Sequence, residues 1–158
     1  MPGWAAAARA RELGFTTQVL TTFVEGEART VALLCAALLK EEASYNAPLV
    51  RPACWILGGE TTVTVTGAGK GGRNQELALA AALALEGVAD VAIASLGTDG
   101  TDGPTDAAGA VASGDTARLG RSLGVDAAQA LAANDSYTYF SALGDLIEDR
   151  WVGSPVDT

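Results

Sequence analysis

Between Thr61 and Leu96, strand, loop, helix and strand signals follow one another without interruption, and this succession constrains the fold more than any other feature. Thr61 to Thr66 (TTVTVT) alternates polar and apolar side chains, with the period of two that is typical of a half-exposed strand. Gly67 to Gly72 is a glycine-rich loop, and Asn74 to Glu86 (NQELALAAALALE) is rich in strong helix formers. Val91 to Leu96 is a short apolar run that indicates a buried strand. A chain of this pattern builds a sheet that is covered by helices.

The remaining segments extend the same pattern. We predict helices over residues 4–13 and 26–43, two or three short helices over residues 115–146, and strands over residues 17–20, 53–57 and 108–112. The strands at 53–57 and 61–66 flank Gly58-Gly59-Glu60, which predicts a tight turn and an antiparallel pair. Because strands interleave with helices, the predicted fold class is α/β: a layered, partly antiparallel (mixed) sheet with helices on both faces, in one domain over residues 1–158.

The charge of the chain and its lack of histidine exclude several classes of function. The formal net charge is -9, so nucleic acid and anionic membranes are not expected partners, because both need a basic surface. Without histidine, Ser-His-Asp and Cys-His catalysis and His-ligated zinc are excluded. Cys35 and Cys54 are expected to be reduced, buried thiols. No apolar run approaches the roughly 18 residues of a membrane span, and the first residues lack a signal-peptide pattern, so we expect a cytoplasmic protein.

The first candidate site is the glycine-rich loop together with the start of the helix that follows it. Glycines let an anion approach the backbone, and a helix N-terminus offers unpaired N–H groups and a positive dipole end. Lys70 and Arg73 are the only basic residues between Arg51 and Arg118, so two cations stand alone here in an acidic chain. This combination favours an anion-binding site. The alternative is a solvated loop with two surface cations.

The same loop matches the dinucleotide-binding pattern G-x-G-x-x-G through Gly67, Gly69 and Gly72. Two features argue against a dinucleotide. The preceding strand alternates Thr and Val, whereas the first strand of a dinucleotide-binding unit is buried on both faces and nearly all apolar. The nearest downstream acid, Asp90, stands before the next strand instead of at its end. The P-loop pattern fails, because Lys70 is followed by glycine and not by Ser or Thr.

Two further polar segments are candidates. Asp99, Asp102 and Asp106 lie in a loop after a buried strand, where α/β folds place their sites. These carboxylates could hold Mg²⁺ or accept a proton from a hydroxyl, although Asp and Gly are also common turn formers. The second segment is Asn134-Asp135-Ser136-Tyr137, for which we favour a helix N-cap over a site.

Five stretches of this chain match a known pattern in the same order. They are GEAR (Gly26–Arg29), GGETTVTV (Gly58–Val65), GGRNQE (Gly71–Glu76), GTDGTDGPTDAAGA (Gly97–Ala110) and NDSY (Asn134–Tyr137). They resemble the C-terminal domain, often called MOFRL, of the glycerate 2-kinase family, whose members have also been described as hydroxypyruvate reductases. The resemblance runs from about Ala5 to Ile147. After the sequence GDL the family usually continues with a TGPTGTNVND-type segment, whereas this chain has EDRWVGSP over residues 148–155.

The resemblance implies a kinase that uses ATP and Mg²⁺ to phosphorylate the 2-hydroxyl of D-glycerate. Family members place the active site between this domain and a Rossmann-like N-terminal domain. We expect this chain to lack that domain and to need it as a partner, in cis or in trans. The isolated chain is therefore expected to be inactive.

The resemblance also implies roles for residues at the matching positions. Arg73, with Lys70 as helper, is expected to bind the transferred phosphate or the substrate carboxylate, because a guanidinium group grips either one in two places. Asp99 and Asp102 are expected to bind Mg²⁺ or to orient the attacking hydroxyl. The other expected substrate- or phosphate-binding residues are Gly71, Gly72, Asn74, Glu76, Asn134, Asp135 and Glu60.

Two other functions remain open from the sequence. One is an NAD(P)-dependent hydroxypyruvate reductase, and the other is a non-catalytic binding or oligomerisation module, with a homodimer among its forms. If the matching motifs form one site, Arg73, Asp99 and Asn134 should face a common cleft.

Overall fold

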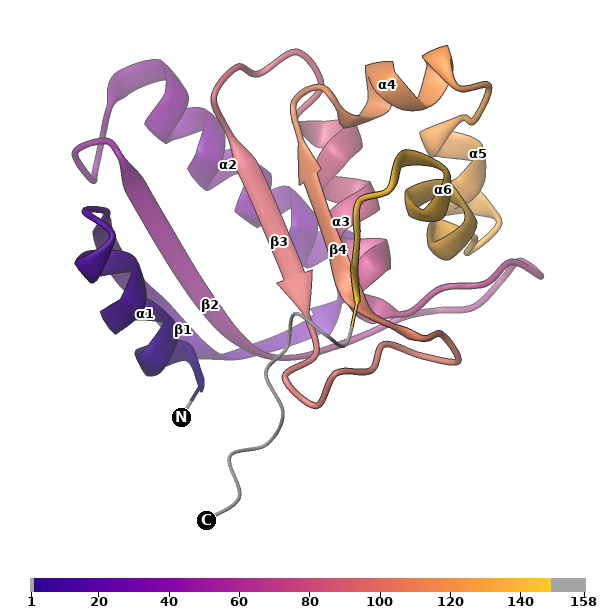
Figure 1. Ribbon diagram of the computed structural model, residues 1–158, viewed down its shortest axis with the longest axis horizontal. Helices are drawn as coiled ribbons and strands as arrows, with labels where there is room; N and C mark the ends of the chain where they lie inside the picture. The colour runs from indigo at the N-terminus through magenta and orange to yellow at the C-terminus, as the bar shows by residue number, and fades with distance from the viewer. Residues whose placement is uncertain (1, 149–158) are drawn as a thin grey trace.

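The structure is a computed structural model that describes residues 2–148, and it contains two separate sheets (Figure 1). In the first sheet, β1 (Thr16–Glu27) pairs in parallel with β2 (Ala53–Thr62). In the second, β4 (Ala107–Ser113) pairs in antiparallel fashion with β3 (Ala92–Leu96) on one side and β5 (Leu146–Glu148) on the other. The mixed α/β class is therefore confirmed, with the parallel and antiparallel pairings in different sheets.

Helices cover both faces of the parallel pair. Helix α1 (Pro2–Glu12) packs on one face of this pair and α2 (Ala28–Tyr45) on the other. The other helices pack around α3 and the second sheet; they are α3 (Arg73–Ala84), α4 (Thr116–Ser122), α5 (Ala127–Ala132) and α6 (Ser136–Leu143). Consecutive side chains of a strand point to opposite faces. On β2, Ile56 lies against Gly3 of α1, whereas the Trp55 indole Nε1 donates a hydrogen bond to Glu42 of α2 at 3.2 Å. None of the helices within residues 2–148 is both long and apolar enough to cross a membrane.

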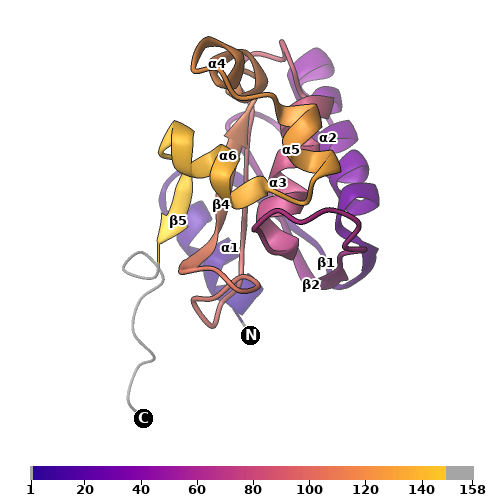
Figure 2. The same ribbon diagram turned by 90° about the vertical axis from the view of Figure 1, so that its right-hand side faces the viewer.

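Helix α3 is the centre of the core. In Figure 1 it lies between α2 on one side and α5 and α6 on the other, and Figure 2 views it from the side of α5 and α6. Eight consecutive residues, Gln75 to Ala82, are buried, and six of the eight are Ala or Leu. Three of the six belong to one core cluster (Ala78, Leu79 and Ala82) and three to the other (Leu77, Ala80 and Ala81). The small alanine side chains allow α2 and β4 to approach closely, and Tyr139 and Phe140 of α6 close the opposite end. This packing fixes the N-terminus of α3, where the candidate site begins.

The predicted hairpin over residues 53–66 is wrong, because β2 continues straight through Gly58 and Gly59 to Thr62. The two glycines do not form a turn; they allow β1 to approach β2 closely. Gly59 has a φ of 144°, and a Cβ there would lie 2.2 Å from the carbonyl oxygen of Val24. Since β1 shifts register between Thr21 and Val24, its bulge presses on β2 at this point.

Other differences are smaller. Strand β1 is longer than the predicted 17–20, β5 was not predicted, and the short helices number three, within the range that we expected. Cys35 and Cys54 are free, as expected, although Cys54 is only half-buried. Burial raises the pKa of both thiols. The unusual stretch 148–155 lies outside the described residues, apart from Glu148 at the end of β5.

Candidate functional site

The N-terminus of α3 is held by a carboxylate from a distant loop. The backbone N–H groups of Asn74 and Gln75 donate hydrogen bonds to Asp102 Oδ1 and Oδ2, at 3.0 and 2.9 Å. Asp102 is only 2% exposed, so this carboxylate sits at the positive end of the helix, in the position that we expected an external anion to take. A Cβ on Gly72 would lie 2.4 Å from the Asp102 carboxyl carbon, which explains why glycine is needed there. The geometry gives Asp102 and Gly72 a positioning role.

Asn74 links this helix end to β3. Its side-chain Nδ2 donates to Asp102 Oδ1 at 3.1 Å, and its Oδ1 accepts a hydrogen bond from the Ser95 hydroxyl at 2.8 Å. We call residues 97–106, with Asp99, Asp102 and Asp106, the acidic loop. Gln75 Nε2 donates a hydrogen bond to Thr105 Oγ1 at 2.9 Å, which connects the end of this loop to the same helix. The acidic loop is therefore anchored at Asp102 and Thr105, and Asp99 lies on its exposed part.

Glu76 belongs to a buried polar network on the other side of α3. It is 2% exposed, and its Oε1 accepts a hydrogen bond from Arg29 Nε at 2.6 Å. Its Oε2 accepts from Asn134 Nδ2 at 3.0 Å, while Arg29 Nη2 also donates to the Leu131 carbonyl at 2.7 Å. Both carboxylate oxygens are satisfied within the protein, so Glu76 joins α2, α3 and α5. Arg29, part of the GEAR motif, was not singled out as a site residue from the sequence; its pairing with Glu76 becomes visible only in three dimensions.

Asn134 and Asp135 clamp the glycine-rich loop. Asn134 Oδ1 accepts hydrogen bonds from the backbone N–H groups of Thr66 and Gly67, both at 2.8 Å. Asp135 Oδ1 accepts from the N–H of Lys70 at 2.9 Å. Asp135 does hold the N-cap position of α6, but its side chain makes no capping bond with the α6 backbone. Its Oδ1 also accepts a hydrogen bond from the Thr138 hydroxyl of α6 at 2.7 Å, so this segment links the glycine-rich loop to the first turn of α6.

The glycines of the loop pack against the same segment of the chain. A Cβ on Gly67 would lie 2.2 Å from the Ala133 carbonyl oxygen, one on Gly69 2.4 Å from the Asp135 Cβ, and one on Gly71 2.2 Å from the Ser136 hydroxyl. Contacts within the protein thus account for the glycine spacing that also matches the dinucleotide pattern.

Lys70, Tyr137 and Asp106 form a small group at the surface of the loop. Lys70 Nζ lies 4.1 Å from the centroid of the Tyr137 ring, and the Tyr137 hydroxyl donates to Asp106 Oδ1 at 2.7 Å. The hydrogen bond from Tyr137, followed by the smaller effect of the Lys70 charge, lowers the pKa of Asp106 below its usual range. The same hydrogen bond raises the pKa of Tyr137.

Replacing Tyr137 by Phe should raise the pKa of Asp106 toward the ordinary aspartate value, because the main stabilising hydrogen bond is lost. A group whose pKa is lowered by folding stabilises the protein above its unfolded-state pKa, and this contribution is lost as the pH falls through the folded-state value. The stability difference between the protein and Tyr137→Phe should therefore be present at neutral pH and disappear in acid. Carboxyl-carbon NMR titration measures the pKa directly. Tyr45→Phe, an exposed tyrosine of α2, is the control, and an unchanged Asp106 pKa in Tyr137→Phe would contradict the assignment.

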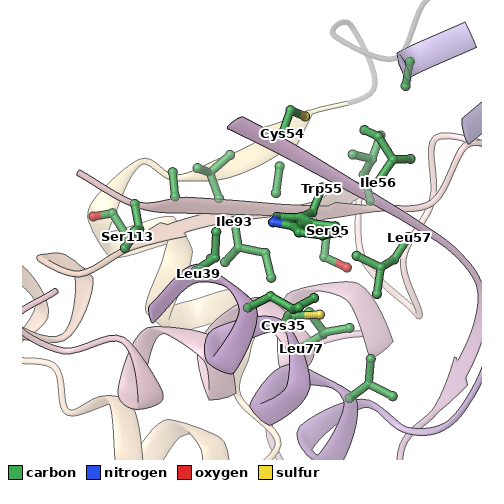
Figure 3. Close-up of a pocket in the computed structure, with 18 of the residues that line it drawn as sticks. Cys35, Leu39, Cys54, Trp55, Ile56, Leu57, Leu77, Ile93, Ser95 and Ser113 are labelled. Carbon is green, nitrogen blue, oxygen red and sulfur yellow. The ribbon is translucent and has the colours of Figure 1, made fainter. Parts of the chain in front are cut away.

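Arg73 and Asp99 lie on one cavity. Arg73 opens α3 and is about 40% exposed at its side chain, with Nη1 3.4 Å from Glu60 Oε1; Glu60 is largely exposed. Arg73, Asn74 and Asp99 line a cavity of about 1550 Å³, shown in Figure 3, that extends between β2 and β3. Asn134 is not among its lining residues. The expected common cleft is therefore found for Arg73 and Asp99 but not for Asn134, which is buried behind the glycine-rich loop.

Asp99 and Asp102, the two expected Mg²⁺ ligands, lie in different surroundings. Within residues 2–148, no three Cys, Asp or Glu side chains are placed to bind one metal ion. Both oxygens of Asp102 accept N–H donors, whereas Asp99 is exposed and accepts a single hydrogen bond, from Thr101 N–H at 3.2 Å. Of these two carboxylates, Asp99 is the one with room for an external ligand.

Comparison with known proteins gives consistent results. The chain is 49% identical over 94% of its length to the D-glycerate 2-kinase of Thermotoga maritima, and 39% identical over 98% to the glycerate 2-kinase of Pyrococcus horikoshii. Two Agrobacterium vitis proteins that carry a hydroxypyruvate reductase name are each 39% identical over 90% of the chain and are covered over 33% and 38% of their own length. A crystal structure of a glycerate kinase from T. maritima superposes with a TM-score of 0.88 at 48% identity, and one of a P. horikoshii protein with 0.85 at 40%.

These matches cover only part of the relatives. The chain spans 36% of the T. maritima protein and 35% of the P. horikoshii protein, and 34% of the chain in each of the two crystal structures. In the structures, the match covers 90% and 92% of this chain. The model of the MOFRL family matches residues 53–156. This chain belongs to the MOFRL family and corresponds to about a third of the glycerate kinases that it matches.

Proposed function

We propose that this chain is the C-terminal domain of an ATP-dependent glycerate 2-kinase and forms one wall of the cleft in which phosphate is transferred to the 2-hydroxyl of D-glycerate. The observation that carries the proposal is the placement of Arg73 and Asp99 on one cavity, beside a helix end that the buried Asp102 holds in position. The names of the relatives support this reaction class. The other wall would come from the family's N-terminal domain, in cis or in trans.

Phosphoryl transfer depends mainly on positioning and on stabilising the charge of the phosphate oxygens, so it requires no histidine. In our proposal the Arg73 guanidinium binds the transferred phosphate or the glycerate carboxylate through two parallel hydrogen bonds. Its ion pair with the exposed Glu60, at 3.4 Å, is long enough for an anionic ligand to replace. Lys70 adds positive charge nearby, although it now lies over Tyr137.

Asp99 would orient the 2-hydroxyl of glycerate or hold Mg²⁺. When bound, Mg²⁺ would neutralise charge on the nucleotide phosphates, and such ions are held by one or two carboxylates together with substrate phosphates and water. The exposed Asp99 carboxylate on this wall fits that pattern. Asp102, Asn74, Gly71 and Gly72 position the helix end and the loop, and the network of Glu76, Asn134 and Asp135 supports them from behind.

The reductase name of the A. vitis relatives makes a nicotinamide-dependent reductase the second candidate. Two observations favour the kinase. The glycine pattern is explained by contacts with residues 102 and 133–136, and the Asp102 carboxylate already occupies the helix N-terminus at which a dinucleotide pyrophosphate would bind. The third candidate, a non-catalytic module, predicts no turnover under any assay condition.

The isolated chain should produce negligible ADP in the presence of ATP, Mg²⁺ and D-glycerate, because one wall of a cleft cannot position both substrates. A chimera in which this chain replaces the matching part of the T. maritima D-glycerate 2-kinase should restore activity. A coupled ADP assay measures the activity of both proteins, and a reaction of the chimera without added D-glycerate is the control. Sustained glycerate-dependent ADP production by the pure isolated chain would contradict the proposed division of the site. A folded but inactive chimera would favour the non-catalytic module.

A further inference from the structure

Strands β2 and β3 lie side by side with a gap between them (Figure 1). They begin at the same end of the molecule, where Arg51 and Asp90, just before each strand, form an ion pair at 4.0 Å. Within residues 2–148, β2 pairs with β1 alone and β3 with β4 alone, so each strand turns an unpaired edge toward the gap. Two sheet edges with free N–H and C=O groups therefore face each other.

The direction of the β3 backbone groups follows from its pairing with β4. The N–H of Gly97 donates to the Ala108 carbonyl at 2.8 Å, and backbone groups alternate in direction along a strand. The N–H and C=O groups of Ile93 and Ser95 therefore point to β4, and those of Ala92, Ala94 and Leu96 point into the gap. An added strand would lie about 4.8 Å from each edge and could bond to both.

The cavity between the two strands has room on both faces of such a strand. Figure 3 shows Cys54 and Ile56 on one side of the strand layer and Trp55 and Leu57 on the other, where Cys35 of α2 and Leu77 of α3 close the cavity. Its volume of about 1550 Å³ exceeds the roughly 300–1,000 Å³ of pockets for small molecules. The lining is mostly apolar, and on the side of α2 and α3 it is formed by Val31, Cys35, Leu38, Leu39 and Leu77. The part of the cavity that runs along the two strands, before Arg73 and Asp99 near their carboxyl ends, therefore fits an extended polypeptide segment.

Glu42 supplies a second, independent indication of a ligand. It lines the cavity and is only 4% exposed. Its Oε1 accepts hydrogen bonds from Trp55 Nε1 and from the N–H of Leu49, at 3.2 and 3.0 Å, whereas its Oε2 has no partner among the described residues. A buried carboxylate oxygen without a donor is costly, and an incoming lysine or arginine would supply one.

We propose that the gap binds one extended segment of a partner polypeptide as an additional strand between β2 and β3. The segment is about five residues long, to match β3, and turns apolar side chains toward α2 and α3. At the end that reaches Glu42 it carries a basic residue. Backbone hydrogen bonds to both edges provide affinity, and the apolar face and the Glu42 carboxylate provide specificity.

The test uses the full chain and a synthetic peptide, acetyl-KVTVTVK-amide, whose two lysines allow either direction of binding. We expect saturable binding below about 1 mM by calorimetry. Amide hydrogen exchange followed by NMR should then slow at least about tenfold at Ala92, Ala94 and Leu96, and change little at Ile93 and Ser95, which already bond to β4. Binding that leaves the three gap-facing amides unprotected, as for an apolar small-molecule site, would overturn the proposal. Lack of binding would overturn it as well.

Variants of both partners separate strand addition from simple apolar contact. The peptide KVTPTVK lacks one central N–H and should bind at least about tenfold more weakly. Glu42→Gln keeps the Oε1 contacts but removes the negative charge. It should lower the affinity for KVTVTVK at least about threefold and leave the affinity for QVTVTVQ, in which glutamine replaces both lysines, unchanged. Ala94→Pro removes a gap-facing N–H without breaking a bond to β4, and it should weaken both peptides. If Ala94→Pro does not fold, the exchange pattern of the unmodified chain still decides the question.

Discussion

Replacing Arg73 by lysine in the chimera with the T. maritima protein should lower kcat/KM for glycerate about a hundredfold, equivalent to about 3 kcal/mol of transition-state stabilisation. Lysine keeps the positive charge but loses the planar pair of donors that grips a phosphate or carboxylate. The unfolding transition should not move, because the Arg73 side chain is about 40% exposed and its contact with Glu60 is long. Steady-state kinetics and thermal melting measure the two effects separately.

Arg118→Lys is the matched control for this substitution. Arg118 is also partly exposed and also pairs with a nearby carboxylate, Asp115, but it lies in α4 and does not line the cavity. We expect its kcat/KM to stay within about twofold of the parent chimera. If Arg73→Lys behaves in the same way, within about threefold, Arg73 is a surface cation and the site does not lie at the start of α3.

Replacing Asp102 by asparagine should destabilise the isolated chain by about 3 kcal/mol, because the helix loses a charged cap and one of two backbone donors loses its acceptor. The site is buried, so water cannot replace the lost hydrogen bond. The change in shape is minimal, which separates this effect from cavity formation. Urea denaturation followed by circular dichroism measures the free energy of unfolding.

Asp99→Asn makes the same chemical change three residues earlier in the same loop. Asp99 is exposed and accepts one hydrogen bond from Thr101, so its unfolding free energy should change by less than about 0.5 kcal/mol. In the chimera, by contrast, Asp99→Asn should lower activity. Equal stability of Asp102→Asn and the unmodified chain would contradict the positioning role of Asp102.

Local signals in the sequence predicted most of the regular elements. The run from Asn74 to Glu86 has both high helix propensity and small residues, and it became the buried helix α3. The apolar run before Leu96 and the polar, glycine-rich loop after it were also as predicted. These segments depend on short-range preferences that agree with the final packing, which is why a single sequence was sufficient.

The predicted hairpin is wrong because its glycines allow a close contact with a distant strand and do not form a turn. Gly58-Gly59 has the composition of a tight turn, but Gly59 is required by the close approach of Val24, a residue 35 positions earlier. Strand β5 has only three residues and gains its order from pairing with β4. The local sequence alone predicts neither the contact of β1 with β2 at Gly59 nor the pairing of β5 with β4.

The site was predictable as a set of residues but not as an arrangement. The motif resemblance located Arg73, Asp99, Asp102 and Asn134, whereas their partners lie far away along the chain. Asp102 bonds to a helix that begins 29 residues earlier, and Arg29 reaches Glu76, which is 47 residues away. Composition and spacing cannot distinguish a carboxylate that caps a helix from one that faces a ligand, and only the structure separates Asp102 from Asp99 in this way.

The most direct test of the proposed function is to identify the product formed by the chimera from ATP, Mg²⁺ and D-glycerate. Phosphorus NMR distinguishes 2-phosphoglycerate from 3-phosphoglycerate and follows the appearance of ADP in the same sample. The proposed function predicts ADP and 2-phosphoglycerate in equal amounts, with no oxidation of NADH or NADPH when hydroxypyruvate is supplied instead. Nicotinamide-dependent reduction of hydroxypyruvate without any 2-phosphoglycerate from a folded chimera would contradict it.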